Sequence, residues 1–96
     1  MAQRAAIVTG ASSGIGLAIV RMLLEEGWNV TLGGRRPEKL EAAVAALDAG
    51  DRVASVAGNM ADEDTIKGLV ATHRDRFGRL DLLVNNAGVG IGAPVA

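Results

Sequence analysis

Four short apolar segments recur along the chain, separated by three longer segments with helical periodicity. The apolar segments are residues 5–9, 28–32, 52–57 and 80–84. The first of them, residues 5–9, has the form that is typical of a strand buried on both faces. Strands that alternate with helices form parallel sheets, because right-handed crossovers return the chain to the same end of the sheet. The segment order therefore predicts an α/β fold with a doubly wound parallel sheet and helices on both faces.

The three intervening segments contain recognisable helix signals. Gly27 is expected to end the first helix, Pro37 to begin the second, Gly50 to close the second, and Asp62 to lie at the start of the third. Two apolar stripes are expected: Ile15, Ala18, Ile19, Met22 and Leu23 on the first helix, and Ile66, Leu69, Val70 and Phe77 on the third. The connections are then only a few residues long, as expected for one compact domain over residues 1–96.

Composition argues against several classes of function. Ten basic and eleven acidic residues give a formal charge of -1, so no strong positive field would attract nucleic acid or an anionic membrane. The chain has no cysteine and a single histidine, His73, which disfavours a metal centre. We interpret His73 as an imidazole at the surface or boundary. No apolar run reaches the roughly 18 residues that cross a bilayer, and we expect a cytoplasmic protein.

A glycine-rich turn joins the first strand to the first helix. It reads Thr-Gly-Ala-Ser-Ser-Gly-Ile-Gly over residues 9–16. Gly10 allows a sharp turn off the strand, Gly14 lets the backbone approach a pyrophosphate, and Gly16 permits close packing of the helix on the sheet. Backbone N–H groups, two hydroxyl groups and the helix dipole would then hold the anion. The residues expected to bind it are Gly10, Ser12, Ser13, Gly14, Ile15 and Gly16.

Two other interpretations of the turn compete with pyrophosphate binding. A triphosphate-binding P-loop would require a Gly-Lys-Ser or Gly-Lys-Thr sequence, which does not follow here. A tight strand-to-helix turn that binds nothing stays open, because glycine motifs also occur in turns without a ligand.

A second motif, Asn-Asn-Ala-Gly at residues 85–88, follows the fourth apolar segment. Together with Thr-Gly-x-x-x-Gly-x-Gly, it resembles the pattern of the short-chain dehydrogenase/reductases, over about residues 5–91. The resemblance implies a three-layer Rossmann-type sheet, truncated here after the fourth strand, with NAD or NADP bound at the glycine turn. It also implies cofactor roles for Asn86, Ala87 and Gly88, while Asn85 and Asn86 can at the same time satisfy buried backbone groups.

In the same family an acidic residue and a small apolar residue line the adenine pocket after the third strand. The matching positions here are Asn59 and Met60. An Asn side-chain oxygen can accept a hydrogen bond from the adenine amino group as a carboxylate does, but the neutral contact is weaker. The resemblance therefore implies an adenine contact of reduced strength at these two residues.

The end of the second apolar segment favours NADP over NAD. A carboxylate about 20 residues after the glycine turn is typical of proteins that bind NAD, because it binds the ribose hydroxyls and repels a 2′-phosphate. The corresponding residue is Gly34, and it is followed by Arg35 and Arg36, whose guanidinium groups can hold a phosphate. The competing interpretation is that both arginines are solvated turn residues.

The resembled family interconverts carbonyl and alcohol groups of small molecules with a Tyr, a nearby Lys and a Ser. The chain has no tyrosine, so no catalytic residue is assigned in it. We expect the N-terminal cofactor-binding part of a longer NADP-dependent oxidoreductase, homo-oligomeric when complete. We expect neither turnover nor independent stability from these 96 residues alone. The alternative is a non-catalytic module that binds NADP(H) or pairs with another subunit.

Overall fold

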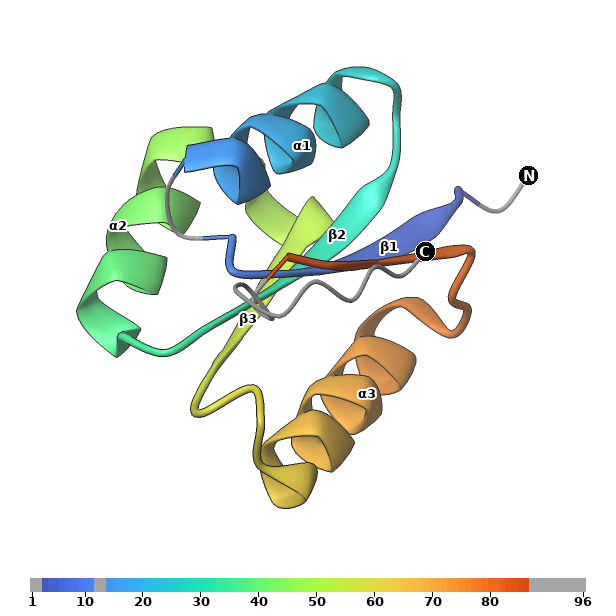
Figure 1. Ribbon diagram of the computed structural model, residues 1–96. Coiled ribbons are helices and arrows are strands. Elements are labelled where there is room, and N and C mark those ends of the chain that lie inside the picture. The colour runs from blue at the N-terminus through green and yellow to red at the C-terminus, as the bar shows by residue number, and fades with distance from the viewer. Residues whose placement is uncertain (1–2, 12–13, 87–96) are drawn as a thin grey trace.

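The computed structural model describes residues 3–11 and 14–86. Figure 1 shows one sheet between two helical layers, with α1 and α2 on one face and α3 on the other. The helices are α1 (Gly14–Glu25), α2 (Pro37–Leu47) and α3 (Glu63–Phe77), and a short 3-10 turn, η1, spans Gly50–Arg52. The strands are β1 (Ala5–Thr9), β2 (Asn29–Gly34), β3 (Val53–Ala57) and β4 (Leu82–Asn85). The predicted three-layer α/β arrangement is confirmed.

Neighbouring strands of the sheet are parallel, in the order β3-β2-β1-β4. Ile7 of β1 lies opposite Thr31 of β2 and Leu83 of β4. The chain therefore builds outward from β1 through β2 to β3 and then crosses to the other side of β1. A reversal of this kind leaves a crevice outside the carboxyl ends of the two strands beside it, where α/β proteins bind ligands. Here those strands are β1 and β4, which end at Thr9 and Asn85.

The side chains of β2 alternate between the two helical layers. Val30 and Leu32 are fully buried in one apolar cluster with Val20 of α1 and Leu40 of α2. Thr31 is also fully buried, and its hydroxyl group meets α3 through a hydrogen bond. Because strand side chains alternate with a period of two, a sheet covered on both faces buries every position of a central strand.

The end of α1 follows the sequence prediction. Gly27 has a φ of +92°, Trp28 N donates to the Leu23 carbonyl over 3.0 Å, and Gly27 N donates to the Leu24 carbonyl over 3.1 Å. These two bonds make a Schellman motif, which ends a helix and satisfies two of its last carbonyl groups.

The end of α2 differs from the prediction that Gly50 closes the helix. Asp48 takes the left-handed position with a φ of +49°, and its backbone N–H donates to the Val44 carbonyl. Gly50 instead begins η1. Short polar side chains such as Asp tolerate the left-handed region better than most residues, so the helix ends before it reaches the glycine.

The predicted apolar stripe of α1 is only partly correct. Leu23 is buried and Ile19 packs against the core, as predicted, but Ile15 is 72% exposed and Met22 is 54% exposed. The other buried residues of the helix are Gly16 and Val20. Gly16 has to lie against the backbone of the preceding turn, and this contact fixes the rotation of the helix. Val20 and Leu23, four and seven positions after Gly16, then face the sheet, and Ile15 faces solvent.

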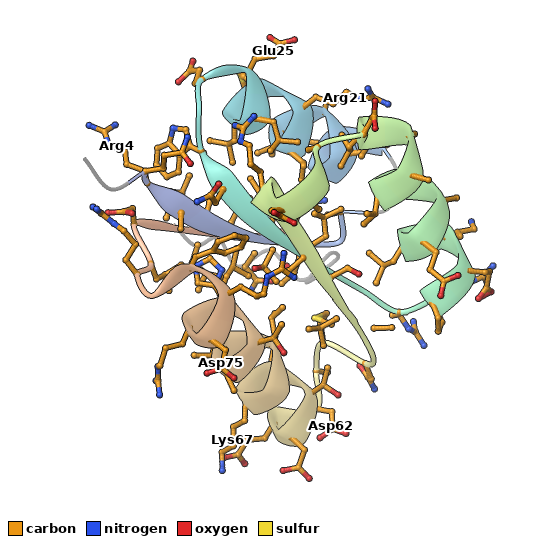
Figure 2. The ribbon with its side chains drawn as sticks, turned by 180° about the vertical axis from the view of Figure 1, so that it is seen from behind. Arg4, Arg21, Glu25, Asp62, Lys67 and Asp75 are labelled. Carbon is orange, nitrogen blue, oxygen red and sulfur yellow. The ribbon has the colours of Figure 1, made fainter. Side chains whose placement is uncertain are left out.

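The start of α3 agrees with the prediction. The side chain of Asp62 accepts a hydrogen bond from Asp64 N over 3.0 Å, as a helix N-cap does. Figure 2 shows Asp62 and Lys67 projecting from α3 away from the sheet. Lys67 Nζ lies 3.4 Å from Glu63 Oε2 in an exposed ion pair, which contributes little to stability.

His73 of α3 is buried, which contradicts its interpretation as a surface or boundary residue. It is only 2% exposed, while Val70, expected to face the sheet, is 36% exposed. Its Nδ1 lies 2.7 Å from Thr31 Oγ1, and its Nε2 lies 2.8 Å from the Arg79 carbonyl oxygen. A carbonyl can only accept, so Nε2 carries the proton and Nδ1 accepts from the Thr31 hydroxyl group.

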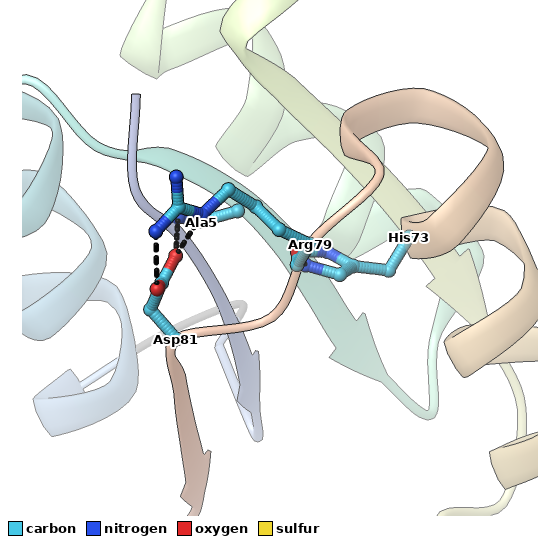
Figure 3. A network of polar contacts seen from close by, with 4 residues as sticks. All are labelled: Ala5, His73, Arg79 and Asp81. Atoms are coloured by element: carbon cyan, nitrogen blue, oxygen red, sulfur yellow. Dashed lines mark hydrogen bonds and ion pairs between the residues drawn. The ribbon is translucent and has the colours of Figure 1, made fainter. Parts of the chain in front are cut away.

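The segment between α3 and β4 is tied to the start of β1 (Figure 3). Two nitrogens of Arg79 donate to the two carboxylate oxygens of Asp81, each over 2.8 Å, and Ala5 N donates to the same carboxylate over 2.9 Å. The Arg79 side chain, followed by the Ala5 N–H, holds the pKa of Asp81 below its usual range. The carboxylate thus joins the amino ends of the neighbouring strands β1 and β4.

Acid is expected to destabilise the fold through His73. Burial lowers the pKa of His73 below its ordinary value and outweighs the Arg79 carbonyl and the charge of Asp81, which both favour the protonated ring. The unfolded chain, whose histidine titrates near about pH 6.5, therefore binds the proton more tightly than the folded chain. The stability that the neutral ring of His73 contributes is therefore fully present above about pH 6.5. It is lost as the pH falls through the lower pKa of the folded state.

Urea unfolding at pH 7.5 and pH 5.5 tests this expectation in the intact protein. The wild type should lose more stability between the two pH values than the variant His73→Gln does. An NMR titration that gave His73 a pKa at or above the ordinary value would contradict it, and this measurement needs no variant.

Candidate cofactor-binding site

The glycine-rich turn lies at the carboxyl end of β1 and leads into α1. Gly10 has a φ of +63°, and Ala11 N donates to the Gly33 carbonyl of β2 over 3.2 Å. A Cβ atom on Gly16 would collide with the Gly10 carbonyl group and lie 3.0 Å from Ala11 Cα. Gly16 was predicted to pack on the sheet, and it instead lets α1 pack closely against the turn that follows β1.

Gly14 has the opposite surroundings. Its φ is +60°, and a Cβ atom placed on it would meet no described atom within 4 Å. It is the first residue of α1, where backbone N–H groups lack partners within the helix and the helix dipole is positive. Gly14 therefore fits a turn whose backbone faces an anion at close range. Ile15 is exposed beside it, and the predicted contacts Ser12 and Ser13 lie outside the described residues.

Thr9 and Asn86 fasten this turn to the end of β4. Asn86 N donates to Thr9 Oγ1 over 3.0 Å, and Asn86 Nδ2 donates to the Gly10 carbonyl over 3.2 Å. The Thr9 hydroxyl group in turn lies 3.1 Å from Asn85 Oδ1. Asn86 thus satisfies backbone groups, as expected, and also positions the turn. Ala87 and Gly88 lie outside the described residues.

The sequence motif includes Thr9, but no role was predicted for its side chain. The signal that could have identified it is a polar side chain as the last residue of an otherwise apolar strand. Thr9 is only 3% exposed, so its hydroxyl group needs partners, and the neighbouring strand end supplies them.

The end of β2 carries the two candidate phosphate-binding arginines. Arg35 and Arg36 are exposed, and within residues 3–11 and 14–86 their side chains make no hydrogen bond or ion pair. Arg36 is the N-cap residue of α2, and its carbonyl accepts from Leu40 N over 3.1 Å. Gly34 is buried, and a Cβ atom on it would lie 3.2 Å from Leu40 Cδ2. The structure thus brings two exposed arginines without an ion pair among the described residues to this strand end, with Glu38 following in the first turn of α2.

Asn59 and Met60 follow β3, next to the end of β2. Gly58 N donates to the Gly34 carbonyl over 2.8 Å and joins the two strand ends. The Asn59 side-chain oxygen, expected to accept from adenine, already accepts from Ala61 N over 2.9 Å. The Met60 sulfur would lie 3.1 Å from a Cβ atom on Gly33 and so covers the bare backbone there.

Neither a metal cluster nor a spanning helix accompanies these features in the part of the chain that the structure describes. No group of three or more His, Asp or Glu side chains there could hold a metal ion. No helix among these residues has the length and apolar character needed to cross a membrane.

The ends of β1, β2 and β3 are therefore followed by a glycine-rich turn, two arginines and a polar turn, along one edge of the sheet. The family whose model matches residues 4–96 is described as short chain dehydrogenase. The chain belongs to the short chain dehydrogenase family. The resemblance carried by its two motifs is confirmed, and it extends over almost all of the sequence.

Individual short chain dehydrogenases are similar to this chain in sequence and in structure. It is 42% identical over 90 residues to serine 3-dehydrogenase of Agrobacterium fabrum, covering 94% of this chain and 35% of the relative. L-sorbose reductase of Gluconobacter frateurii, solved with NADPH and L-sorbose, is 37% identical with a TM-score of 0.85, over 99% of this chain and 37% of that one. A 3-ketoacyl-(acyl-carrier-protein) reductase of Brucella melitensis, solved with NADH, is 26% identical with a TM-score of 0.78, over 85% and 33%.

The chain matches only part of the length of each relative. The chain spans about a third of the length of the curated relatives that it matches, 35% for the serine dehydrogenase. The matched third contains the glycine-rich turn and the ends of β2 and β3.

Proposed function

We propose that these residues bind the adenosine diphosphate half of NADP(H) in a short chain dehydrogenase that interconverts carbonyl and alcohol groups of a small molecule. The observation that carries the proposal is the contrast between two glycines of one turn. Gly16 is closed against the Gly10 carbonyl, whereas a Cβ atom on Gly14, at the positive end of α1, would meet no atom of the described residues within 4 Å. The absence of a side chain at Gly14 leaves the N–H groups at the start of α1 open to an anion, which favours pyrophosphate binding at this turn.

The residues of this chain then have separate tasks. The backbone N–H groups at the start of α1 hold the pyrophosphate, with Ser12 and Ser13 as proposed hydroxyl donors. Asn86 keeps the turn in place through the Gly10 carbonyl, and Ala87 and Gly88 are proposed to border the cofactor next to it. The bound nicotinamide would supply or accept the hydride, while the proton-transfer residues belong to the rest of the protein, since the chain has no tyrosine.

The choice of NADP(H) rests on Arg35 and its neighbours. The end of β2 has no carboxylate to repel a 2′-phosphate, and the exposed guanidinium group of Arg35 is available to bind one. Similar short chain dehydrogenases have been solved with NADPH and with NADH, so the family alone does not decide this choice. Arg36 is the weaker candidate, because its backbone already caps α2.

Replacing Arg35 by alanine is expected to weaken NADPH binding about tenfold or more and to leave NADH binding unchanged. A charge-assisted hydrogen bond to the phosphate contributes on the order of 1.5 to 3 kcal/mol, and NADH has no phosphate at that position. Dissociation constants of both cofactors for the intact protein, measured by calorimetry at fixed ionic strength, check this prediction and the proposed function together.

Arg74→Ala is the matched control, because it removes the same charge from an exposed position on α3. It should leave both dissociation constants unchanged. Tighter binding of NADH than of NADPH by the wild type would overturn the choice of NADP(H), and binding of neither would overturn the proposed function. Gly34→Asp is a less specific test of cofactor preference, because its Cβ atom would lie 3.2 Å from Leu40 Cδ2 and would change the packing as well.

A further inference from the structure

Arg52, the last residue of η1, joins three elements at the amino end of the sheet. Its Nη2 donates to the Leu24 carbonyl of α1 over 2.7 Å and to the Trp28 carbonyl, just before β2, over 2.8 Å. Its own backbone leads directly into β3. The Arg52 side chain therefore links the end of α1 to the starts of two neighbouring strands, β2 and β3.

The packing of α1 on the sheet uses few fully buried side chains. Its buried residues are Gly16, Val20 and Leu23, and the first of them has no side chain. Three further apolar residues of α1 are only partly buried against the core. The last turn of α1 contains no basic residue, so the helix itself supplies no positive charge for its negative end. Arg52 supplies that charge from 28 positions beyond Leu24.

Contacts with other segments hold α1 at both of its ends. At its start, a Cβ atom on Gly16 would lie 3.0 Å from Ala11 Cα, so the helix lies directly against the glycine-rich turn. At its end, Arg52 holds the Leu24 carbonyl. Loss of the second contact would leave the helix free to pivot about the first. Such a pivot would change the direction in which the N–H groups at the start of α1 point.

We propose that Arg52 is a positioning residue for the pyrophosphate of the cofactor, because it fixes the end of α1 and thereby keeps the N–H groups at its start aimed at the anion. This inference rests on the proposed function. The charge of Arg52 does not act on the anion directly. The 12 residues of α1 separate its two ends by about 18 Å, which exceeds the screening length of about 8 Å at physiological ionic strength.

The test measures dissociation constants of NADPH and NADH for the intact protein, by calorimetry without substrate. Arg52→Met keeps an apolar stem but removes both hydrogen bonds, and it should bind each cofactor about fivefold more weakly than the wild type. The factor should be the same for both, since both contain the pyrophosphate. This result would differ from that of Arg35→Ala, which should weaken NADPH binding alone.

Arg76→Met is the matched control for a loss of stability without a change in α1. Arg76 Nη2 donates to the Asp51 and Val53 carbonyls over 3.2 and 3.4 Å, so it joins α3 to the start of β3 on the other face of the sheet. Its replacement removes the same kind of contact. Urea unfolding should show a loss of stability in this variant, and both dissociation constants should stay at the wild-type values.

Conservative variants of Arg52 separate the hydrogen bonds from the guanidinium shape. Arg52→Lys should bind both cofactors within about twofold of the wild type, because one nitrogen makes both bonds and an ammonium group can also donate to two carbonyls. The buried Nε of Arg52 makes no hydrogen bond with the described residues, so lysine loses nothing there. Arg52→Gln keeps only a neutral donor and should weaken both cofactors about threefold, which provides the test if Arg52→Met does not fold.

The outcomes distinguish this inference from the function on which it rests. Wild-type affinity in Arg52→Met or Arg52→Gln, or an equal loss in Arg76→Met, would overturn the role of Arg52 and leave cofactor binding intact. A loss for NADPH alone would also overturn it, because the effect would then belong to the 2′-phosphate. Failure of the wild type to bind either dinucleotide would overturn both the inference and the proposed function.

Discussion

Replacement of Gly16 by alanine is expected to lower the free energy of unfolding by about 3 kcal/mol, near the upper end of the usual range for an overpacked site. The added Cβ atom would collide with the Gly10 carbonyl group, with the carbonyl carbon at 2.8 Å and Ala11 Cα at 3.0 Å. All of these are backbone atoms, and Gly10 is held in turn by Asn86 Nδ2. The helix can therefore relieve the overlap only by moving away from the sheet.

Urea unfolding of the intact protein, followed by circular dichroism, measures this loss. Gly68→Ala is the matched control, since it adds the same methyl group inside α3, where the new Cβ atom would meet no described atom beyond its own stretch of helix within 4 Å. Because alanine favours a helix more than glycine does, the control should gain about 1 kcal/mol. Equal stability of Gly16→Ala and the wild type would show that α1 does not depend on this contact.

Replacement of Gly14 by valine is expected to weaken dinucleotide binding by about a hundredfold or more while most of the fold survives. The side chain would enter the open space where the pyrophosphate is proposed to lie, and it would separate the anion from the N–H groups of α1. The φ of +60° adds strain, which for a left-handed residue with a Cβ atom costs about 1 to 2 kcal/mol. Calorimetric titration with NADPH gives the affinity, and urea unfolding gives the stability.

Gly78→Val is the control that separates the effect of backbone strain from the loss of dinucleotide binding. Gly78 ends α3 with a φ of +74° and also has open space around it, so this variant should lose similar stability. It lies away from the glycine turn and should keep the wild-type affinity for NADPH. An unchanged affinity in Gly14→Val would mean that the pyrophosphate lies elsewhere.

The order of the elements was predictable from the sequence because it depends on local patterns. Short apolar runs indicated the strands, and Gly27 and Pro37 marked helix ends by their own backbone preferences. The buried face of α1 was not predictable in the same way. Its rotation depends on a contact between Gly16 and Gly10 through space, and the apolar residues Ile15 and Met22 gave a misleading stripe.

Partners outside α3 explain the burial of His73. It was assigned to the surface or boundary because no acid or nucleophile lies at a spacing that would give it a catalytic role. Thr31 provides one partner from 42 positions away, and the Arg79 carbonyl provides the other. A polar side chain can be buried when such partners exist, and a single sequence does not reveal them.

The features of the candidate site also differ in whether they depend on local sequence or on distant contacts. Gly10, Gly14 and Gly16 were predictable because each meets a backbone requirement within the turn. The contacts of Thr9 and the orientation of the Asn59 amide were not, because the first needs the end of β4 beside β1 and the second depends on which atom Ala61 N meets. The roles of Ser12, Ser13, Ala87 and Gly88 remain predictions.

The position of β4 beside β1 sets the order in which the site can assemble during synthesis. β1 can pair with β2 as soon as the first 34 residues are available, whereas the Asn86 bond to Thr9 spans 77 positions. Contacts that close long loops form late, because the entropy of closure must be lost before they contribute. We therefore expect the nascent chain to acquire a β-α-β core early, and the phosphate turn to be fixed only after Asn86 has left the ribosome.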